Sequence, residues 1–289
     1  MKRINVIAST AIALLFAVGA ASGQRNLLAD NAALRYWAAF SQLQDAAITD
    51  QQAKELDSVL ETMGSFDISK YSDLIQKNTL ALEIMARGTS LPNCDWGLDY
   101  GLGEDVPVDY ARKALVLGRL NILYAMQLYH SGNPDGAIGA LAAGLRFSRD
   151  VANGGSLFPT LAAKDLLVTH LVAINDAVRM GQLSTAQRSR LQNAVAALGD
   201  GLDWSAAVKR DLGALGPRYS GQSRVSASLA RITSSYAAVL KGESSLSSLM
   251  DAINHAPVEL AKVIPNPKRV QEQKQELSEK LQQARLLLQ

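Results

Sequence analysis

The sequence of 289 residues has one cysteine, three histidines and only 6% aromatic residues. The single cysteine, Cys94, cannot form a disulfide within the chain, so packing has to supply the stability. The three histidines stand apart from one another, and there is no nucleophile elbow, zinc-binding helix, phosphate loop or dinucleotide fingerprint. From these absences we expect a protein that is not an enzyme and that carries no catalytic, cofactor-binding or metal site.

An excess of charge of one sign is absent as well. The chain has 29 Lys and Arg residues against 27 Asp and Glu residues. Two of the basic residues, Lys2 and Arg3, belong to an N-terminal segment that we expect to be removed, which leaves a formally neutral chain. The other basic residues are scattered and do not form the clustered patch that binds phosphate backbones. We therefore expect no nucleic acid partner.

The N-terminus has the pattern of a secretory signal. Lys2 and Arg3 precede an apolar stretch from Val6 to about Ala21, which ends in small residues. The unbroken apolar run is shorter than the roughly 20 residues that cross a bilayer. Residues 1–23 are therefore predicted to be a cleaved signal peptide, with an uncleaved anchor helix as the alternative. We expect an exported bacterial protein, periplasmic or extracellular, that has no stable membrane span after cleavage.

The rest of the chain is predicted to be almost entirely helical. Apolar residues recur at helical spacing in residues 30–41, 49–63 and 68–88, and none of these segments alternates with a period of two. Residues 110–129 are apolar around most of the helix circumference, which is typical of a central, buried helix. Further helical segments follow from residue 158 onward. The predicted fold class is therefore all-α.

An amphipathic segment ends the chain. Its apolar stripe stands against Gln, Glu and Lys on the other faces. We assign residues 24–265 to one helical domain and residues 266–289 to a C-terminal helix. The stripe favours a helix that is docked on the domain, and the alternatives are self-association or a partner-binding arm through residues 268–289.

The helical pattern stops over about residues 88–107, which are rich in Gly, Pro and acidic residues. Connections of this length inside a compact domain are usually functional loops or Ω-loops. The aromatic residues of this segment favour a long ordered loop in which Trp96, together with Tyr100, packs against the helices. The candidate partner or pocket residues of this loop are Cys94, Asp95, Trp96, Asp99 and Tyr100.

The cysteine and the acids of this loop suggest two other chemistries, which the residues themselves disfavour. Acidic neighbours raise the pKa of a thiol, so Cys94 is interpreted as a packing cysteine, with an intermolecular or redox role as the alternative. The acids Asp95, Asp99, Glu104 and Asp105 do not have the alternating spacing of a calcium-binding loop.

Each histidine has a structural interpretation. His130 lies at a predicted helix end, where a cation offsets the negative end of the helix dipole. His170 stands between Leu167 and Leu171, which indicates an interior position. His255 is predicted to lie at another helix end. None of the three is assigned a functional role.

The turn and helix that run from residue 131 to residue 145 carry a family resemblance. A Gly-containing turn precedes a helix that sets the small residues Ala137, Ala140 and Gly144 beside a stripe of Ile and Leu. This segment is similar to the second half of a tetratricopeptide repeat. With the Gly-Gly-Ser-Leu junction at 154–157, residues 108–180 also resemble uncharacterised, signal-bearing bacterial proteins. The resemblance implies antiparallel helix hairpins stacked as a tetratricopeptide-like superhelix, and it carries over no activity and no functional residue.

These features favour an exported helical scaffold that binds a peptide or an envelope protein in a groove between helices. One alternative is a protein that binds an apolar small ligand in a cavity between helices. The other is an enzyme whose acid and base groups converge near the loop, with Asp95, Asp99, Glu104 and His130 or His170 as the set.

Overall fold

The computed structural model describes residues 30–44, 67–179 and 183–289. Within these ranges the regular structure is helical, and the sole β contact is an isolated backbone bridge between Asn31 and Asn93. The predicted all-α class is therefore confirmed. The predicted signal peptide at 1–23 and the predicted helix at 49–63 lie outside the described residues.

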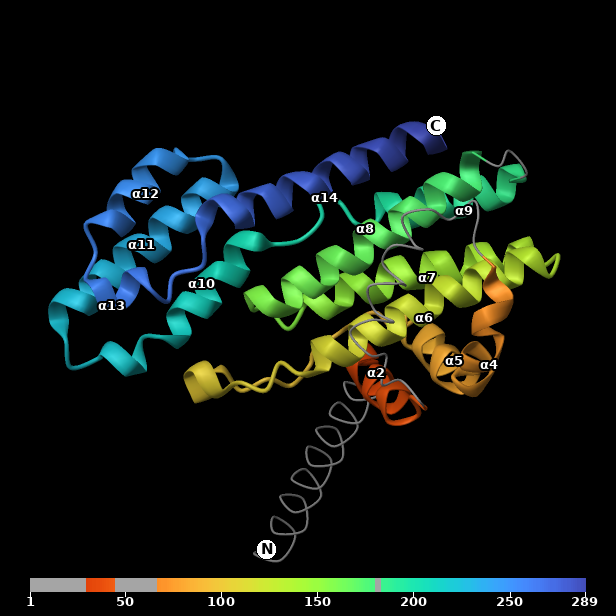
Figure 1. Cartoon of the computed structure of the whole chain (residues 1–289), viewed down its shortest axis with the longest axis horizontal. Helices are drawn as coiled ribbons and strands as arrows, with labels where there is room; N and C mark the ends of the chain where they lie inside the picture. Colours follow the sequence, from red (N-terminus) through yellow and green to blue (C-terminus); the bar gives the residue numbers. More distant parts are fainter. Residues whose placement is uncertain (1–29, 45–66, 180–182) are drawn as a thin grey trace, which may run out of the picture.

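The described helices follow the chain in the order that the colours of Figure 1 trace. They are α2 (Ala32–Ser41), η2 (Ile68–Tyr71), α4 (Ser72–Lys77), α5 (Thr79–Gly88), η3 (Tyr100–Asp105), α6 (Tyr110–His130), α7 (Pro134–Ala152), α8 (Leu157–Arg179), α9 (Thr185–Ala196), α10 (Trp204–Ala214), η4 (Pro217–Tyr219), α11 (Ser223–Lys241), α12 (Leu246–Asn254), α13 (Val258–Ala261) and α14 (Pro267–Leu288).

Side-chain caps set the start of several of these helices. Asn133 caps α7, and Pro134 occupies its first position, where the missing N–H group has no helical partner to lose. Ser184 and Gln187 form a reciprocal capping box at the start of α9. The turn and helix predicted to run from residue 131 onward are therefore confirmed.

Helices α6, α7 and α8 form the centre of the fold. They lie side by side and alternate in direction (Figure 1), because short turns join α6 to α7 and α7 to α8. The middle of α6, from Leu117 to Met126, is buried on most sides, as its apolar circumference predicts. The antiparallel hairpin of α6 and α7 is thus present, whereas the tetratricopeptide-like superhelix stays a prediction.

A glycine allows α7 to approach its neighbours closely. A Cβ added to Gly144 would lie 2.0 Å from His170 Nε2 and 2.5 Å from the side-chain nitrogen of Asn121.

His170 is fully buried, and its Nδ1 lies 2.7 Å from the carbonyl oxygen of Leu166. Burial lowers the pKa of His170 to about 4, so the imidazole is neutral at pH 7. Its Nδ1–H then donates to Leu166, and Nε2 accepts from Asn121 at 3.2 Å. The predicted interior position of His170 is confirmed.

Helix α8 is the central helix of this packing. Among the described residues it alone is long and apolar enough to cross a membrane, and 67% of its most apolar window is buried inside the protein. The core helix of a compact domain passes the same test of length and composition. Its burial against α6, α7, α10 and α14 accounts for its apolar character.

The C-terminal helix α14 is docked along α8 and α9 (Figure 1). Its buried face consists of the apolar stripe that the sequence shows: Val270, Leu277, Leu281, Ala284 and Leu288. Lys164 of α8, which is 5% exposed, pairs with Glu276 of α14 at 2.5 Å. The stripe is therefore covered within the chain itself. Self-association through residues 268–289 stays a prediction.

Candidate functional site

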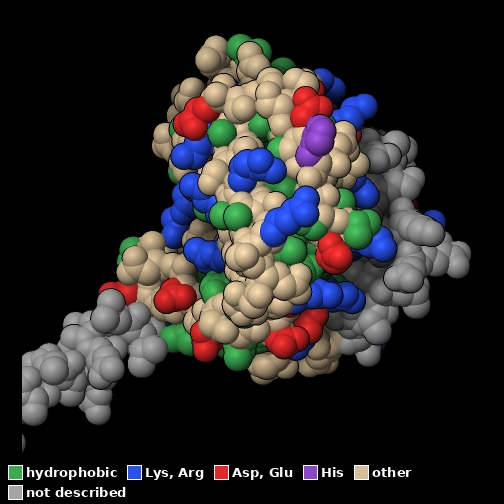
Figure 2. Space-filling view, turned by 90° about the vertical axis from the view of Figure 1, so that its left-hand side faces the viewer, with side chains coloured by type: hydrophobic (Ala, Val, Ile, Leu, Met, Phe, Trp, Pro, Cys, Tyr) green, Lys and Arg blue, Asp and Glu red, His purple; other side chains and the backbone are tan. Residues whose placement is uncertain are grey.

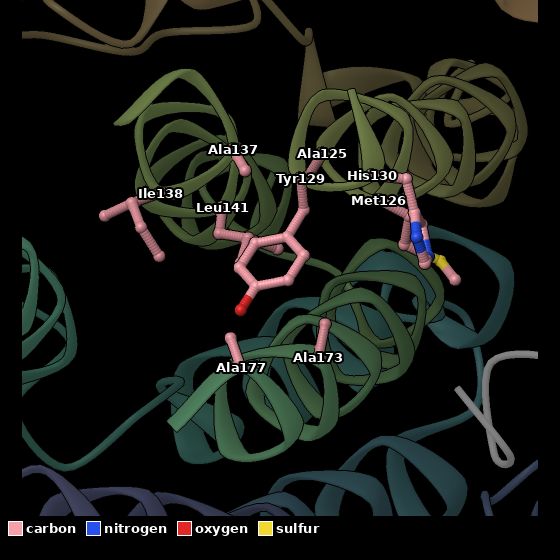
Figure 3. A pocket seen from close by; sticks show the side chains of 9 residues that line it. All are labelled: Ala125, Met126, Tyr129, His130, Ala137, Ile138, Leu141, Ala173 and Ala177. Carbon is pink, nitrogen blue, oxygen red and sulfur yellow. The ribbon is translucent and has the colours of Figure 1, made fainter. Parts of the chain in front are cut away.

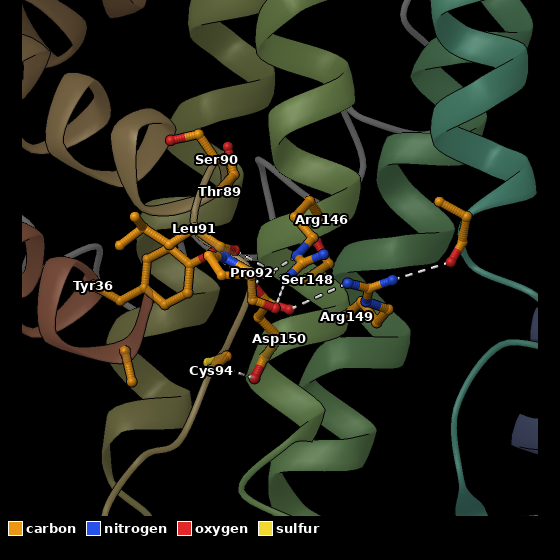
Figure 4. A network of polar contacts seen from close by, with 12 residues as sticks. Tyr36, Thr89, Ser90, Leu91, Pro92, Cys94, Arg146, Ser148, Arg149 and Asp150 are labelled. Atoms are coloured by element: carbon orange, nitrogen blue, oxygen red, sulfur yellow. Dashed lines mark hydrogen bonds and ion pairs between the residues drawn. The ribbon is translucent and has the colours of Figure 1, made fainter. Parts of the chain in front are cut away.

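The loop between α5 and α6 is ordered and is fastened to the helices by polar contacts around Asp150 of α7 (Figure 4). The Asp150 side chain is fully buried, and its Oδ2 accepts hydrogen bonds from Tyr36 Oη at 2.8 Å and from Arg146 Nε at 3.0 Å. Arg146 also reaches the loop, because its Nη2 donates to the carbonyls of Leu91 and Pro92. One buried carboxylate thus joins α2, α7 and the loop.

Opposing effects act on the charge of Asp150. Burial raises the pKa of its carboxyl group, whereas the hydrogen bond from Tyr36 and the charge of Arg146 lower it. A second arginine, Arg149, lies 3.7 Å from Oδ1, which has no hydrogen-bond partner within the described chain. Burial also raises the pKa of the Tyr36 hydroxyl, so this group remains a donor to the carboxylate. These contacts indicate a structural role for Asp150, which holds α2 and the loop against α7.

Cys94 and Trp96 of the loop also contact Asp150. Cys94 is half-buried, with Sγ 3.6 Å from the carbonyl oxygen of Asp150, and burial raises the pKa of its thiol. Trp96 is 5% exposed, stacks on Tyr110 with ring centres 4.0 Å apart, and donates from Nε1 to the same carbonyl at 2.8 Å. The predicted burial of Trp96 against the helices is confirmed. Both side chains fasten the loop from the inside.

Asp95 and Asp99 are exposed and bond locally. Each Oδ1 accepts a hydrogen bond from the backbone nitrogen two residues further on, from Gly97 at 2.9 Å and from Gly101 at 2.8 Å. The Asn31 side chain also bonds to the backbone of Asp95. These two acids shape turns of the loop. Of the five candidate residues, Tyr100 lines a cavity.

That cavity is a cleft of about 740 Å³, part of it open to solvent, between η3, the start of α8, α10 and the segment that precedes α14. The Arg210 guanidinium lies 4.5 Å from the centre of the Tyr100 ring. Burial raises the pKa of Asp211 to about 6, and the backbone nitrogen of Leu157 donates to its Oδ1 at 3.1 Å. The sequence did not single out Arg210 and Asp211, because nothing in their local pattern distinguishes them from surface charges.

A larger groove of about 1,130 Å³, also partly open, runs between α5, α6 and α7. Small residues of α7 line it, among them Gly139, Ala140 and Ala143. Asn121 of α6, which is 2% exposed, also faces it and donates to the carbonyl of Ala140 at 2.9 Å. The sequence signal for this groove is the stripe of small residues on α7.

The charged residues of this groove come from three helices. Glu83 belongs to α5, Arg146 to α7 and Arg190 to α9. The Arg190 guanidinium stands over Gly139, because a Cβ at that glycine would lie 3.2 Å from Nη2. Arg190 forms no ion pair with any residue of the described ranges. The groove therefore presents one unpaired cation beside apolar and amide surface.

A third hollow lies between α6, α7 and α8 (Figure 3). It has an empty volume of about 440 Å³, part of which is open, and its lining is mainly apolar. Alanines on all three helices, Ala125, Ala137, Ala173 and Ala177, leave this space because their side chains end at Cβ. Tyr129 and the exposed His130 supply its polar groups (Figure 3).

The acids of the loop and the histidines have separate hydrogen-bond and ion-pair partners. Asp95 and Asp99 bond to backbone within the loop, and Glu104 pairs with Arg218 at 3.2 Å. His170 bonds only to core groups, and His130 ends α6. Among the described residues, no three His, Cys, Asp or Glu side chains lie close enough to hold a metal ion together.

The comparisons with known proteins give no relative: no protein-family model matches the chain, and neither a curated protein nor a solved structure matches it.

Proposed function

We propose that this chain is an exported, non-enzymatic helical scaffold that binds an extended peptide segment, from a free peptide or an envelope protein, in the groove between α5, α6 and α7. The observation that carries the proposal is the groove itself, with its small-residue lining and its deeply set amide. Export rests on the signal pattern of residues 1–23. The groove lies on the α6–α7 hairpin, the segment that resembles a tetratricopeptide repeat.

The lining suits a peptide in chemical terms. Gly139, Ala140 and Ala143 leave room for side chains of a bound segment, because none of them projects beyond Cβ. Asn121 is held in place by its bonds to Ala140 and His170, so an amide at the groove is already oriented before a ligand arrives. Arg190 can pair with an acidic side chain, since no carboxylate of the described chain occupies it. These features favour a segment that contains at least one Asp or Glu.

The test compares binding of a fluorescent peptide library to the purified protein and to two variants. Ala143→Phe fills the groove, and Arg190→Glu reverses its unpaired charge. We expect the selected peptides to bind each variant about tenfold or more weakly, as the loss of one anchoring contact implies. Ala230→Phe, on the exposed side of α11, is the matched control and should bind like the wild type.

Two results contradict the proposal. One is a library from which no peptide binds the folded wild-type protein. The other is a selected peptide that binds both groove variants with unchanged affinity, because its site then lies elsewhere. Circular dichroism of each variant shows that the comparison is made between folded proteins.

The apolar hollow of Figure 3 favours a second function, the binding of a small apolar ligand. Alanines from three helices leave a space lined by Met126, Ile138 and Leu141, and an apolar ligand that covers this lining gains from the burial. Toluene binding followed by NMR tests it. Ala177→Leu should abolish binding by filling the space, and an unchanged affinity in that variant would contradict this function.

A further inference from the structure

The cleft beside Tyr100 contains polar groups whose bonding capacity the chain leaves unused. Arg210 lies against the Tyr100 ring and forms no ion pair with the described residues. The Tyr100 hydroxyl is buried and has no hydrogen-bond partner in those same ranges. Tyr100 and Arg210 thus line one cleft of about 740 Å³, part of it open to solvent, and the guanidinium has no anion there.

The position of the Arg210 guanidinium is set by groups on two sides. The Tyr100 ring covers it at 4.5 Å, and a Cβ on Gly155 would lie 2.3 Å from its Nη1. Gly155 has a φ of 74°, which an L side chain rarely adopts, so the backbone conformation calls for glycine there. The planar guanidinium is thereby oriented before a ligand binds, which reduces the cost of forming paired hydrogen bonds to a carboxylate.

Charges of both signs surround the cleft, and its own lining carries Arg210 together with the acids Glu104 and Asp211. The segment from residue 204 to residue 269 contains nine Lys and Arg residues against four Asp and Glu residues. Figure 2 shows this end of the molecule, where basic side chains spread across the middle of the face and acidic ones lie nearer its edges. The two acids of the cleft have partners, because Asp211 accepts from the start of α8 and Glu104 pairs with Arg218.

The remaining walls of the cleft are largely apolar. They are formed by Val106, Val108, Phe158, Leu215, Val263 and Pro265. An inorganic anion would leave this surface wet, whereas an organic anion with an apolar body would cover it and gain from the burial.

We propose that this cleft binds a small organic carboxylate with an apolar body. Its carboxylate pairs with the Arg210 guanidinium beside the Tyr100 ring, and its body lies against Val106, Val108 and Phe158. The site is separate from the peptide groove, so the inference does not rest on the proposed function. The sequence suggested Tyr100 as a pocket residue. The inference adds the class of ligand that this pocket would bind.

The experiment is isothermal titration of the purified protein with 4-phenylbutyrate and with 4-phenylbutanol, which has the same body without the charge. We expect the acid to bind at least about tenfold more tightly than the alcohol, as one charged hydrogen-bonded pair implies. Arg210→Gln should remove this preference. Tyr100→Phe keeps the ring that lies against Arg210 and should therefore bind the acid within about twofold of the wild type.

Arg231→Gln is the matched control, because Arg231 is an exposed arginine of α11 in the same basic segment and does not line the cleft. Its affinity for the acid should stay within about twofold of the wild type, since a distant surface charge is screened by salt. Circular dichroism confirms the fold of each variant, and Arg210→Lys, which keeps the charge, should retain part of the preference. The inference is overturned if acid and alcohol bind equally, or if folded Arg210→Gln binds the acid like the wild type, or if Arg231→Gln loses as much affinity as Arg210→Gln.

Discussion

The buried histidine of α8 makes stability depend on pH in a direction that its environment fixes. His170 is fully buried, and burial lowers its pKa from 6.5 to about 4. As the pH falls through this window, the unfolded chain takes up a proton that the folded chain excludes. The free energy of unfolding therefore decreases on acidification, and the contribution of His170 is complete only above about pH 6.5. His170→Gln removes the titrating group.

The size of the effect follows from the two pKa values. Between pH 7.5 and pH 4, the unfolded chain gains about 3 kcal/mol relative to the folded chain from this one group. At pH 7.5 we expect His170→Gln to cost about 1–3 kcal/mol, because the Asn121 amide loses a well-placed acceptor. At pH 4 the wild type should have lost about 3 kcal/mol of this advantage over the variant. If the cost at pH 7.5 is below about 3 kcal/mol, His170→Gln is then the more stable protein.

The wild-type curve alone does not reveal this term, because Asp211 opposes it. Its pKa is raised from 3.8 to about 6, so the folded chain binds a proton more readily than the unfolded chain over that window. Protonation of Asp211 therefore stabilises the folded chain as the pH falls, with a contribution of similar size and opposite sign to that of His170. The difference between wild type and His170→Gln cancels Asp211 and isolates the histidine.

The assay is urea unfolding followed by circular dichroism at intervals from pH 7.5 to pH 4. His255→Gln is the control, because His255 is exposed at the end of α12 and is far less buried than His170. A difference between wild type and His170→Gln that stays constant within about 0.5 kcal/mol over this range would refute the reasoning, since it would mean that His170 gains its proton equally in both states.

Three further tests concern the packing. Tyr36→Phe should lower the free energy of unfolding by about 1–3 kcal/mol, measured in urea, because it removes a donor to a fully buried carboxylate. Gly144→Ala should lower the melting temperature, at a cost of about 1–3 kcal/mol or more, because its Cβ would overlap neighbouring side chains. The control Gly213→Ala, in a helix with free space at this position, should instead stabilise by about 0.5–1 kcal/mol. Glu276→Gln should destabilise more than Lys164→Met in thermal unfolding, because it leaves a buried ammonium without its main partner; equal losses would contradict this.

The helices themselves could be predicted because their signals are local. The Asn133-Pro134 turn, the Ser184 cap and the stripe of α14 each depend on residues within a few positions of one another. The burial of His170 and Trp96 followed from their apolar or aromatic context in the same way. In α2 the local pattern fails, because apolar residues surround most of the helix. Leu34 is 44% exposed and Tyr36 is buried, which helical spacing alone does not decide.

The polar contacts of the candidate sites could not be predicted, because each joins residues that are distant in sequence. Arg146 and Asp150 are four residues apart on α7, a spacing that exposed ion pairs share, and only Tyr36 and the loop show that this pair is buried. Arg210 contacts Tyr100, although more than a hundred residues separate them in the sequence. No local pattern around either residue predicts this contact.

The stripe of small residues on α7 shows why composition alone does not assign a role. Gly144 lies beneath His170 and serves close packing, since an added Cβ has no space there. Ala140 faces the groove, where its small size leaves space open. Ala137 lines the apolar hollow on the other side of the hairpin. Helix α7 therefore lines the groove and the apolar hollow, and it also packs against α8. Small residues occur at all three of these places. Only the position of the neighbouring helices distinguishes a glycine that closes a contact from an alanine that keeps a site open.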